Sequence, residues 1–238
     1  MTGSSVQPAP RDRRWLVVEI GLAYTLSVLA TVVFYQLAQA GGFFREYLHT
    51  LVGAVFVGIP MLVLLPRRES FDDYGLPPQP IWKELLVVLV TALVIYPPFW
   101  VGFRLWWGWE RTFDLMLPAG FASSALANLV VVALPEELFY RGYMLGRIDL
   151  LARRRVSLFG VEVGWSLLIT SALFAVGHYV VTFDVQRLAV FFPALAFGVM
   201  RAWRGSITAA VVFHALCNIF MDILLLGYGI ISPEEYFQ

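Results

Sequence analysis

Hydrophobic residues form long runs along the chain, and short polar or charged segments separate these runs. About 20 apolar residues in a helix span the hydrocarbon core of a bilayer. Unpaired backbone groups are costly in lipid, so such runs predict helices rather than loops or open sheets. The pattern therefore predicts an all-α, polytopic integral membrane helical bundle with about seven transmembrane helices. These spans lie near residues 15–39, 47–65, 82–106, 119–145, 165–182, 186–203 and 206–228.

The composition also indicates a membrane protein. Hydrophobic residues occupy 59% of the 238 positions, charged residues occupy 14%, and the mean hydropathy is +0.73. Soluble globular domains carry about 25% charged residues, so this class is excluded. The single cysteine, Cys217, excludes an intrachain disulfide. The eight tryptophans fit membrane-interface belts better than a stacking surface for nucleic acid, and no nucleic-acid partner is predicted.

The polar segments divide this predicted single domain into four parts. Residues 1–14 are small, polar and proline-containing at their start, which favours a disordered cytoplasmic lead. Residues 15–118 hold the N-terminal transmembrane helices, residues 119–228 the membrane core with the polar motifs, and residues 229–238 a tail. The first span is longer than the apolar core of a secretory signal, about 7 to 15 residues, so we predict an uncleaved anchor.

The distribution of Lys and Arg predicts the orientation in the membrane. Cytoplasmic loops retain these residues, and an N-terminus in the cytoplasm places thirteen of them inside and four outside. An odd number of spans then puts the C-terminal tail on the outer side. The inner set is Arg11, Arg13, Arg14, Arg67, Arg68, Lys83, Arg141, Arg147, Arg153, Arg154, Arg155, Arg201 and Arg204, and the outer set is Arg45, Arg104, Arg111 and Arg187.

Two adjacent acids, Glu136 and Glu137, interrupt the fourth apolar run. An ionised side chain at the centre of a bilayer costs about 2.5 to 3.5 kcal/mol on insertion scales, so such acids predict a functional site with a partner. Arg141 follows Glu137 by four residues, which places the two on one face of a helix. Glu136 points about 100° away on the helix and is left for another role. The alternative is that both acids reach the headgroups from a helix end.

Two later apolar runs also carry polar residues. His178 lies in SALFAVGHYVV, where a single histidine is often a hydrogen-bonded packing residue. In the last run, His214, Asn218 and Asp222 recur every four residues and share one helix face. Three polar groups in hydrocarbon need polar partners, so this face predicts a cavity or a polar cluster. Asp222 either orients His214 or Asn218, or lies near the outer interface.

These residues can form a buried hydrolytic centre. Glu136 would act as general base while His178 positions the same water, and His214 and Asn218 would donate to the oxyanion. A divalent metal such as zinc, held by the two histidines with a glutamate and an asparagine, is the alternative, and the spacing does not choose between the two. The zincin pattern H-E-x-x-H is absent from the sequence. A Cys217/His214 nucleophilic pair is a further option, although an apolar packing role for the thiol is favoured.

Three motifs occur in order within the apolar runs: Glu136-Glu137-x-x-x-Arg141, Phe174-x-x-x-His178 and His214-x-x-x-Asn218. Over about residues 119–226 the chain resembles the CAAX prenyl protease and bacteriocin-processing family (CPBP, or Abi). FDDYGL at 71–76 is similar to a segment ahead of the core in bacterial members. The resemblance implies an all-helical intramembrane endopeptidase of the glutamate type, with metal dependence argued for some members.

The resemblance also implies roles and partners. Glu136 is expected to be the catalytic glutamate, Glu137 and Arg141 its supporting pair, and His178, His214 and Asn218 the remaining catalytic groups. The substrate would be a membrane-embedded or membrane-tethered peptide, cleaved in the bilayer of a bacterial inner membrane. The alternatives are a non-catalytic bacteriocin-immunity or scaffold protein and a proton-coupled transporter, because intramembrane Glu and His can also relay protons.

Overall fold

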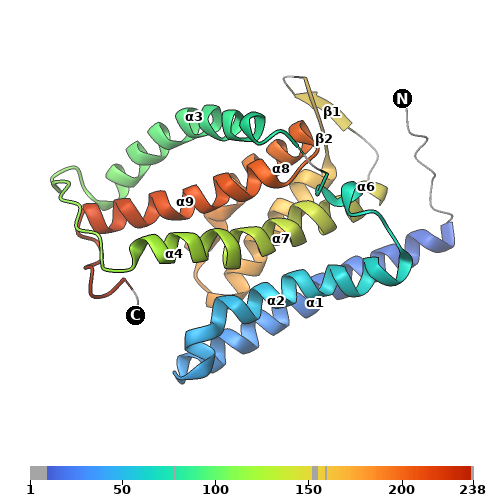
Figure 1. The fold of residues 1–238 in the computed structure, drawn as a ribbon, viewed down its shortest axis with the longest axis horizontal. Helices are drawn as coiled ribbons and strands as arrows, with labels where there is room; N and C mark the ends of the chain where they lie inside the picture. Colours follow the sequence, from blue (N-terminus) through green and yellow to red (C-terminus); the bar gives the residue numbers. More distant parts are fainter. Residues whose placement is uncertain (1–9, 78, 152–154, 159, 237–238) are drawn as a thin grey trace.

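The computed structural model describes residues 10–77, 79–151, 155–158 and 160–236. Seven helices within these ranges are long and apolar enough to cross a membrane, which confirms the all-α bundle of an integral membrane protein (Figure 1). Nine α-helical segments of the described residues contribute to these seven spans, namely α1 (Pro10–Gln39), α2 (Phe43–Arg67), α3 (Ile81–Trp107), α4 (Phe121–Ala127), α5 (Leu134–Glu137), α6 (Leu145–Leu151), α7 (Trp165–Thr182), α8 (Phe191–Arg204) and α9 (Thr208–Gly227), and α4, α5 and α6 belong to one span. Four shorter helical segments join them, namely η1 (Phe71–Tyr74), η2 (Asn128–Ala133), η3 (Leu138–Met144) and η4 (Val185–Val190).

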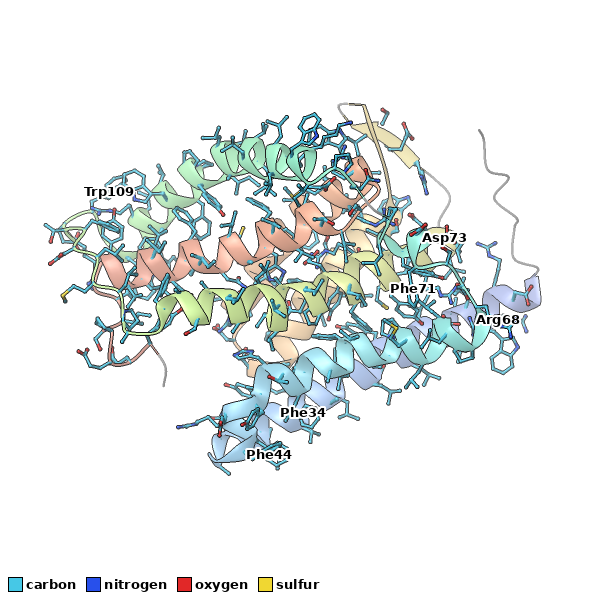
Figure 2. The ribbon with its side chains drawn as sticks, viewed as in Figure 1. Phe34, Phe44, Arg68, Phe71, Asp73 and Trp109 are labelled. Atoms are coloured by element: carbon cyan, nitrogen blue, oxygen red, sulfur yellow. The ribbon has the colours of Figure 1, made fainter. Side chains whose placement is uncertain are left out.

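The first two helices form a hairpin on one side of the bundle. Gly41 and Gly42, both at positive φ, make the tight turn between them, and Phe34 stacks on Phe44 beside it (Figure 2). α4 lies between this hairpin and α9, and α3 packs against the opposite side of α9 (Figure 1). Leucines such as Leu26 and Leu93 remain exposed, as a lipid-facing surface requires.

One structural element departs from the helical pattern. β1 (Arg155–Leu158) and β2 (Val161–Gly164) form a two-stranded antiparallel hairpin in which Arg155 pairs with Gly164. Gly160, at the turn, has a φ of 81°. The hairpin lies at the end of the bundle that also holds η1, outside the spans, so it does not change the fold class (Figure 1).

The predicted disordered lead is wrong for its last five residues. α1 begins at Pro10, so residues 10–14 are helical, while residues 1–9 of the predicted lead lie outside the described residues. Proline suits the first helical position because its missing N–H has no partner there in any case. Asp12 adds a negative charge in the first turn, where the helix dipole favours it. Local helix signals therefore extend the first span toward the N-terminus.

The fourth span is continuous from α4 to α6 but changes its hydrogen-bond pattern twice. The π-helical segments η2 and η3 flank the single α-turn α5, which contains Glu136 and Glu137. The Leu134 N–H donates to the Leu129 carbonyl, five residues back, as a π-turn requires. Pro135 lacks an N–H and so cannot donate to the Val131 carbonyl four residues earlier. π-turns inside α-helices frequently mark functional sites.

Two glycines let the backbone of other segments approach this span closely. A Cβ on Gly53 of α2 would lie 2.8 Å from the Val131 carbonyl oxygen and 3.2 Å from the Pro135 ring. A Cβ on Gly142 of η3 would lie 2.8 Å from the carbonyl oxygen of Tyr74, at the end of η1. The segment FDDYGL thus packs directly against the first motif, and the main-chain N–H of Ile207 donates to Gly75 in the same segment.

An ion-pair network holds that end of the bundle together. Arg147 lies 2.8 Å from both Glu19 of α1 and Glu69, which precedes η1. The Tyr143 hydroxyl donates to Glu19, and the Tyr74 hydroxyl donates to Glu69. Burial acts to raise the pKa of Glu69, but the hydrogen bonds from Arg147 and Tyr74 outweigh it and hold the pKa below the ordinary value of 4.5. The network therefore favours the ionised Glu69.

The lowered pKa of Glu69 makes the free energy of unfolding depend on pH in the acidic range. Since the pKa is lower in the folded protein, the contribution of Glu69 is complete above the unfolded value of 4.5 and is lost as the pH falls through the folded value. We expect Glu69→Gln to lower the melting temperature at about pH 7 and to flatten its decline toward about pH 3. Thermal unfolding in detergent across this range measures both. An unchanged acid dependence relative to the exposed control Glu162→Gln would contradict the expectation.

The close approach at Gly142 gives a second prediction. Gly142→Ala should reduce the free energy of unfolding by about 1 to 3 kcal/mol, because the new methyl group must displace the backbone of Tyr74. Gly102→Ala in α3 is the matched control, since nothing lies within 4 Å of its Cβ position. Denaturation in detergent should show the loss only for Gly142→Ala. Equal stability of the two variants would mean that the two segments are not packed in this way.

Candidate active site

The polar residues of the first and third motifs meet inside the bundle. Glu137 is fully buried, and its Oε1 accepts hydrogen bonds from Arg141 Nη1 and His214 Nδ1, each at 2.9 Å. The Glu137/Arg141 pair predicted from the four-residue spacing therefore forms. Its carboxylate is shared with a histidine on another helix, a contact that the spacing did not predict. Glu137 thus joins α5 to α9 by a charged hydrogen bond.

The Arg141 side chain is held by a hydrogen bond and by two aromatic rings in addition to Glu137. Its side chain is 1% exposed, its Nη2 donates to the Ala194 carbonyl of α8 at 3.1 Å, and its guanidinium lies over the rings of Phe174 and Phe197 at 4.6 and 5.1 Å. Phe174 belongs to the apolar cluster of α1, α2, η3 and α7, and Phe197 to the cluster of α3, α8 and α9. The ion pair therefore lies where the two halves of the hydrophobic core meet.

His214 is held in one orientation by its surroundings. Its ring stacks on Phe197 with centroids 4.8 Å apart and an interplanar angle of 14°. Glu137 is paired with a guanidinium and therefore accepts, so the Nδ1 of His214 is the donor. The Nε2 atom then faces Glu136, whose Oε2 lies 3.8 Å away. This contact is longer than a hydrogen bond, and it brings the first glutamate to the free nitrogen of the imidazole.

Glu136 has a buried carboxylate oxygen that is not hydrogen-bonded among the described residues. Its side chain is 14% exposed, and its Oε2 is buried with no hydrogen-bond partner among the described residues. Buried oxygens of this kind are uncommon because each one costs a desolvation penalty. The second oxygen of Glu137 shares this state. The two glutamates thus each keep one buried oxygen that makes no hydrogen bond among the described residues.

His178 is linked to the centre through an aromatic ring. Its Nδ1 is 2.9 Å from the Phe174 carbonyl, which can only accept, so Nδ1 carries the proton and Nε2 is free in the neutral ring. The ring of Phe174 contacts both imidazoles, with centroids 4.4 Å from His178 and 6.0 Å from His214. The hydrogen bonds described for His178 do not reach either glutamate, so its predicted contact with the Glu136 water stays a prediction.

Asn218 has a partner that the sequence did not single out. Its Nδ2 donates to Asn128 Oδ1 at 3.1 Å, and Asn128 is the first residue of η2. The signal that could have found it is that Asn128 and Asn218 are the two asparagines of the whole chain and both lie in apolar runs. A polar side chain in such a run needs a partner on another helix.

The other two polar candidates near α9 have structural partners. Asp222 accepts a hydrogen bond of 2.8 Å from Tyr236, which supports its placement near the far end of α9 rather than on His214 or Asn218. Cys217 packs against the apolar cluster that contains Val87, Phe197 and Phe213. This environment supports the packing role of the thiol over a nucleophilic pair with His214.

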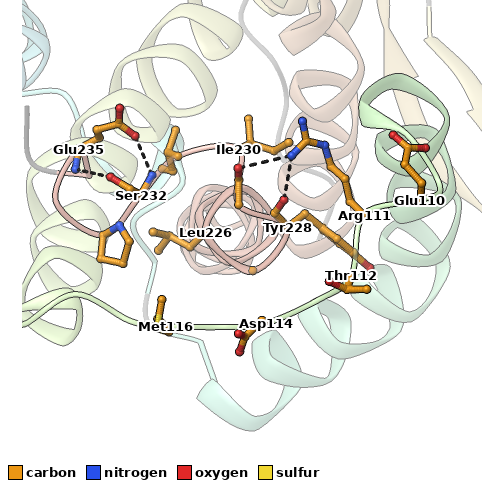
Figure 3. Close-up of a pocket in the computed structure, with 14 residues that line it drawn as sticks. Glu110, Arg111, Thr112, Asp114, Met116, Leu226, Tyr228, Ile230, Ser232 and Glu235 are labelled. Atoms are coloured by element: carbon orange, nitrogen blue, oxygen red, sulfur yellow. Dashed lines mark hydrogen bonds between the residues drawn. The ribbon is translucent and has the colours of Figure 1, made fainter.

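One cavity lies away from these residues. It has a volume of about 580 Å³ and is lined by the segment from Glu110 to Met116 and by the residues that follow Leu226, among them Ser232 and Glu235 (Figure 3). Arg111 crosses one wall and donates to the carbonyls of Tyr228 and Gly229. The cavity is at the end of the bundle opposite η1, and none of the motif residues lines it.

The metal alternative does not fit the donors as they are arranged. Among the described residues, no three side chains of the types His, Cys, Asp and Glu are grouped so that they could hold a metal ion. Glu136 and His214 approach each other, but Glu137 is committed to Arg141 and His214, and His178 is turned toward a backbone carbonyl. We therefore derive no step of the reaction through a metal.

The fold and the site define a class: a polytopic membrane protein with a buried centre of two glutamates, an arginine and a histidine. Residues 118–220 match the family model of the Rce1-like type II CAAX prenyl endopeptidases. The match begins just before α4, ends within α9 and includes all three motifs. The resemblance to the CAAX protease family is thereby confirmed for this segment, and it indicates a membrane protease. The comparisons with curated proteins and with solved structures found no match.

The buried Glu137/Arg141 pair predicts that removing an arginine at the centre destabilises the protein far more than removing one at the surface. Arg141→Leu should reduce the free energy of unfolding by about 3 to 5 kcal/mol because it leaves Glu137 buried without its cation. Arg155→Leu removes the ion pair between Asp149 and an arginine that is 52% exposed. It should change the free energy of unfolding by less than about 1 kcal/mol. Denaturation in detergent measures both. The double variant Glu137→Leu/Arg141→Leu should regain part of the loss; a further loss would contradict this account.

Proposed function

We propose that this protein is an intramembrane endopeptidase in which Glu136 activates the attacking water. The observation that carries this proposal is the geometry around Glu136: a buried carboxylate oxygen without a hydrogen-bond partner among the described residues, 3.8 Å from the Nε2 of an oriented histidine. The match of residues 118–220 to an endopeptidase family supports the reaction class. A general base must have an acceptor oxygen available for the proton of the attacking water, and the unpaired oxygen of Glu136 supplies one.

The proposed reaction follows from these contacts. The Glu136 carboxylate takes a proton from water as the water oxygen bonds to the scissile carbonyl carbon, and the tetrahedral oxyanion forms. The carbon–nitrogen bond then breaks, and the proton held by Glu136 passes to the leaving amine. This transfer balances the atoms without any further reactant. His178, through its free Nε2, would hold the same water by accepting its second hydrogen.

Two side chains of α9 are proposed to stabilise the oxyanion. Asn218 can donate through the Nδ2 hydrogen that Asn128 does not use. His214 can donate through Nε2 only in its imidazolium form, because Nδ1 already donates to Glu137. Glu137 then serves as the orienting carboxylate, in the way that the aspartate of a Ser-His-Asp triad holds its histidine. Arg141 in turn holds the Glu137 carboxylate in place.

The proposed substrate is a peptide that reaches the centre from within or beside the bilayer. The matched family is named for prenylated CAAX ends. Prenylated tails, leader peptides and transmembrane helix ends all satisfy the physical requirement of membrane attachment. We further propose a bacterial inner membrane as its location, with the N-terminus in the cytoplasm, and the Lys and Arg distribution supports this orientation.

The test is cleavage by the purified protein in detergent. A panel with a farnesylated C-terminal CAAX peptide, a leader peptide and a transmembrane peptide would be incubated with the wild type and with Glu136→Gln, and the products analysed by mass spectrometry. Glu136→Gln keeps the shape of the side chain but cannot take a proton, so we expect the rate to fall by a factor of at least about 100. Glu162→Gln, an exposed change on β2, should cleave as the wild type does.

The outcomes separate the alternatives. Equal cleavage by Glu136→Gln and the wild type would refute the base role of Glu136. Loss of cleavage on addition of a chelator, with recovery on zinc, would favour a metal-activated water instead. A wild type that protects cells from a bacteriocin as well as Glu136→Gln does, and that cleaves no peptide, would favour an immunity protein. Proton-coupled flux in liposomes without peptide products would favour a transporter.

A further inference from the structure

The two asparagines of this chain are hydrogen-bonded to each other across two helices. Asn218 Nδ2 of α9 donates to Asn128 Oδ1 of η2 at 3.1 Å, and both side chains are partly buried. Ninety residues separate them in the sequence. The third motif accounts for Asn218, whereas Asn128 precedes the first motif by eight residues and belongs to none of the three. Its position therefore calls for a separate explanation.

The π-turn explains how Asn128 comes to face α9 together with Glu136. Two turns of an α-helix take about seven residues, so a spacing of eight would turn the two side chains apart. A π-turn accommodates one extra residue, which restores the two-turn repeat between Asn128 and Glu136. The contacts agree with this register. Asn128 bonds Asn218, and Glu136 approaches His214, one turn earlier on α9.

We propose that Asn128 is a positioning residue that sets the orientation of the Asn218 amide in the endopeptidase centre. This inference rests on the proposed function and extends it to a residue outside the motifs. An amide can rotate by 180° and exchange its oxygen and nitrogen. With the Asn128 oxygen as acceptor, the nitrogen of Asn218 is held next to η2, and its second N–H stays available as a donor. A rotated Asn218 would bring two carbonyl oxygens face to face, which is repulsive.

A second polar contact between the same helices provides a matched control. The Tyr236 hydroxyl donates to Asp222 of α9 at 2.8 Å and lies 3.4 Å from the Ser124 hydroxyl of α4. Ser124 is one turn before Asn128, and Asp222 is one turn after Asn218. This contact also joins the fourth span to α9, but it lies one turn farther from His214. A role in helix packing alone would make the two contacts equivalent.

The kinetic test compares Asn128→Leu, Asn128→Asp and Tyr236→Phe. Each is made in the wild type and in Asn218→Ala, and each is assayed with the panel peptide that the wild type cleaves. Asn128→Leu should lower kcat by about tenfold with little change in KM, since one orienting hydrogen bond is lost. Asn128→Asp keeps an acceptor oxygen and should retain most of the activity. Tyr236→Phe should lower the melting temperature and leave kcat unchanged.

The double variants decide whether Asn128 acts through Asn218. In the Asn218→Ala background, Asn128→Leu should have no further effect on kcat, because the amide that it orients is gone. The inference is overturned if Asn128→Leu keeps the full kcat, if its loss is equally large in Asn218→Ala, or if Tyr236→Phe lowers kcat by the same factor. The last result would assign both contacts to helix packing.

A measurement without substrate keeps the inference separate from the proposed function. Asparagine labelled with ¹⁵N at the side chain gives two amide signals in this protein, one for each asparagine. Asn128→Leu should move the remaining signal, that of Asn218, and Asn128→Asp should leave a hydrogen-bonded signal. An Asn218 signal with the same shifts in both variants would overturn the inference. Equal cleavage by Glu136→Gln and the wild type would instead refute the proposed base and leave this readout intact.

Discussion

The buried carboxylate of Glu137 is the interaction on which the rest of the centre depends. A carboxylate with no solvent exposure requires compensation, and it receives two hydrogen bonds at its Oε1, one from a guanidinium and one from an imidazole. These two bonds tie α5 to η3 within the fourth span and to α9 across the bundle. Since Arg141 also donates to α8, a single ion pair connects three spans. Removing any partner would leave a buried charge without compensation.

The same constraint gives the two neighbouring glutamates different environments. The Oε1 of Glu137 accepts from both Arg141 and His214, so this carboxylate fixes the orientation of the imidazole. Glu136, the residue before Glu137, points in another direction from the helix. It has an oxygen without a partner among the described residues, and an imidazole nitrogen lies nearby. The two carboxylates therefore have distinct environments, which is how proteins assign different acid and base roles to similar groups. The π-segments on both sides of this turn set the direction in which each one points.

The sequence predicted the fold far better than the contacts of the site. Seven apolar runs define seven spans because lipid leaves few alternatives to a helix, and the four-residue spacing predicted the pair of Glu137 with Arg141. The bond between Glu137 and His214 joins residues 77 positions apart, and no periodicity encodes such a contact. Asn128 was overlooked for the same reason. The π-turns that align it with Glu136 lie in a stretch of Leu, Val and Ala that reads as ordinary helix.

The polar contacts between the fourth span and α9 differ in kind and in burial along the two helices. The Glu137 carboxylate accepts hydrogen bonds at the buried centre, an amide pair follows at Asn128, and Tyr236 donates to the Asp222 carboxylate at the partly buried far end. The cost of an unsatisfied polar group is greatest where burial is most complete, so the loss of a partner would be most destabilising at Glu137. The amide pair lies between these extremes. This single hydrogen bond is the one that we propose to hold the orientation of the Asn218 amide.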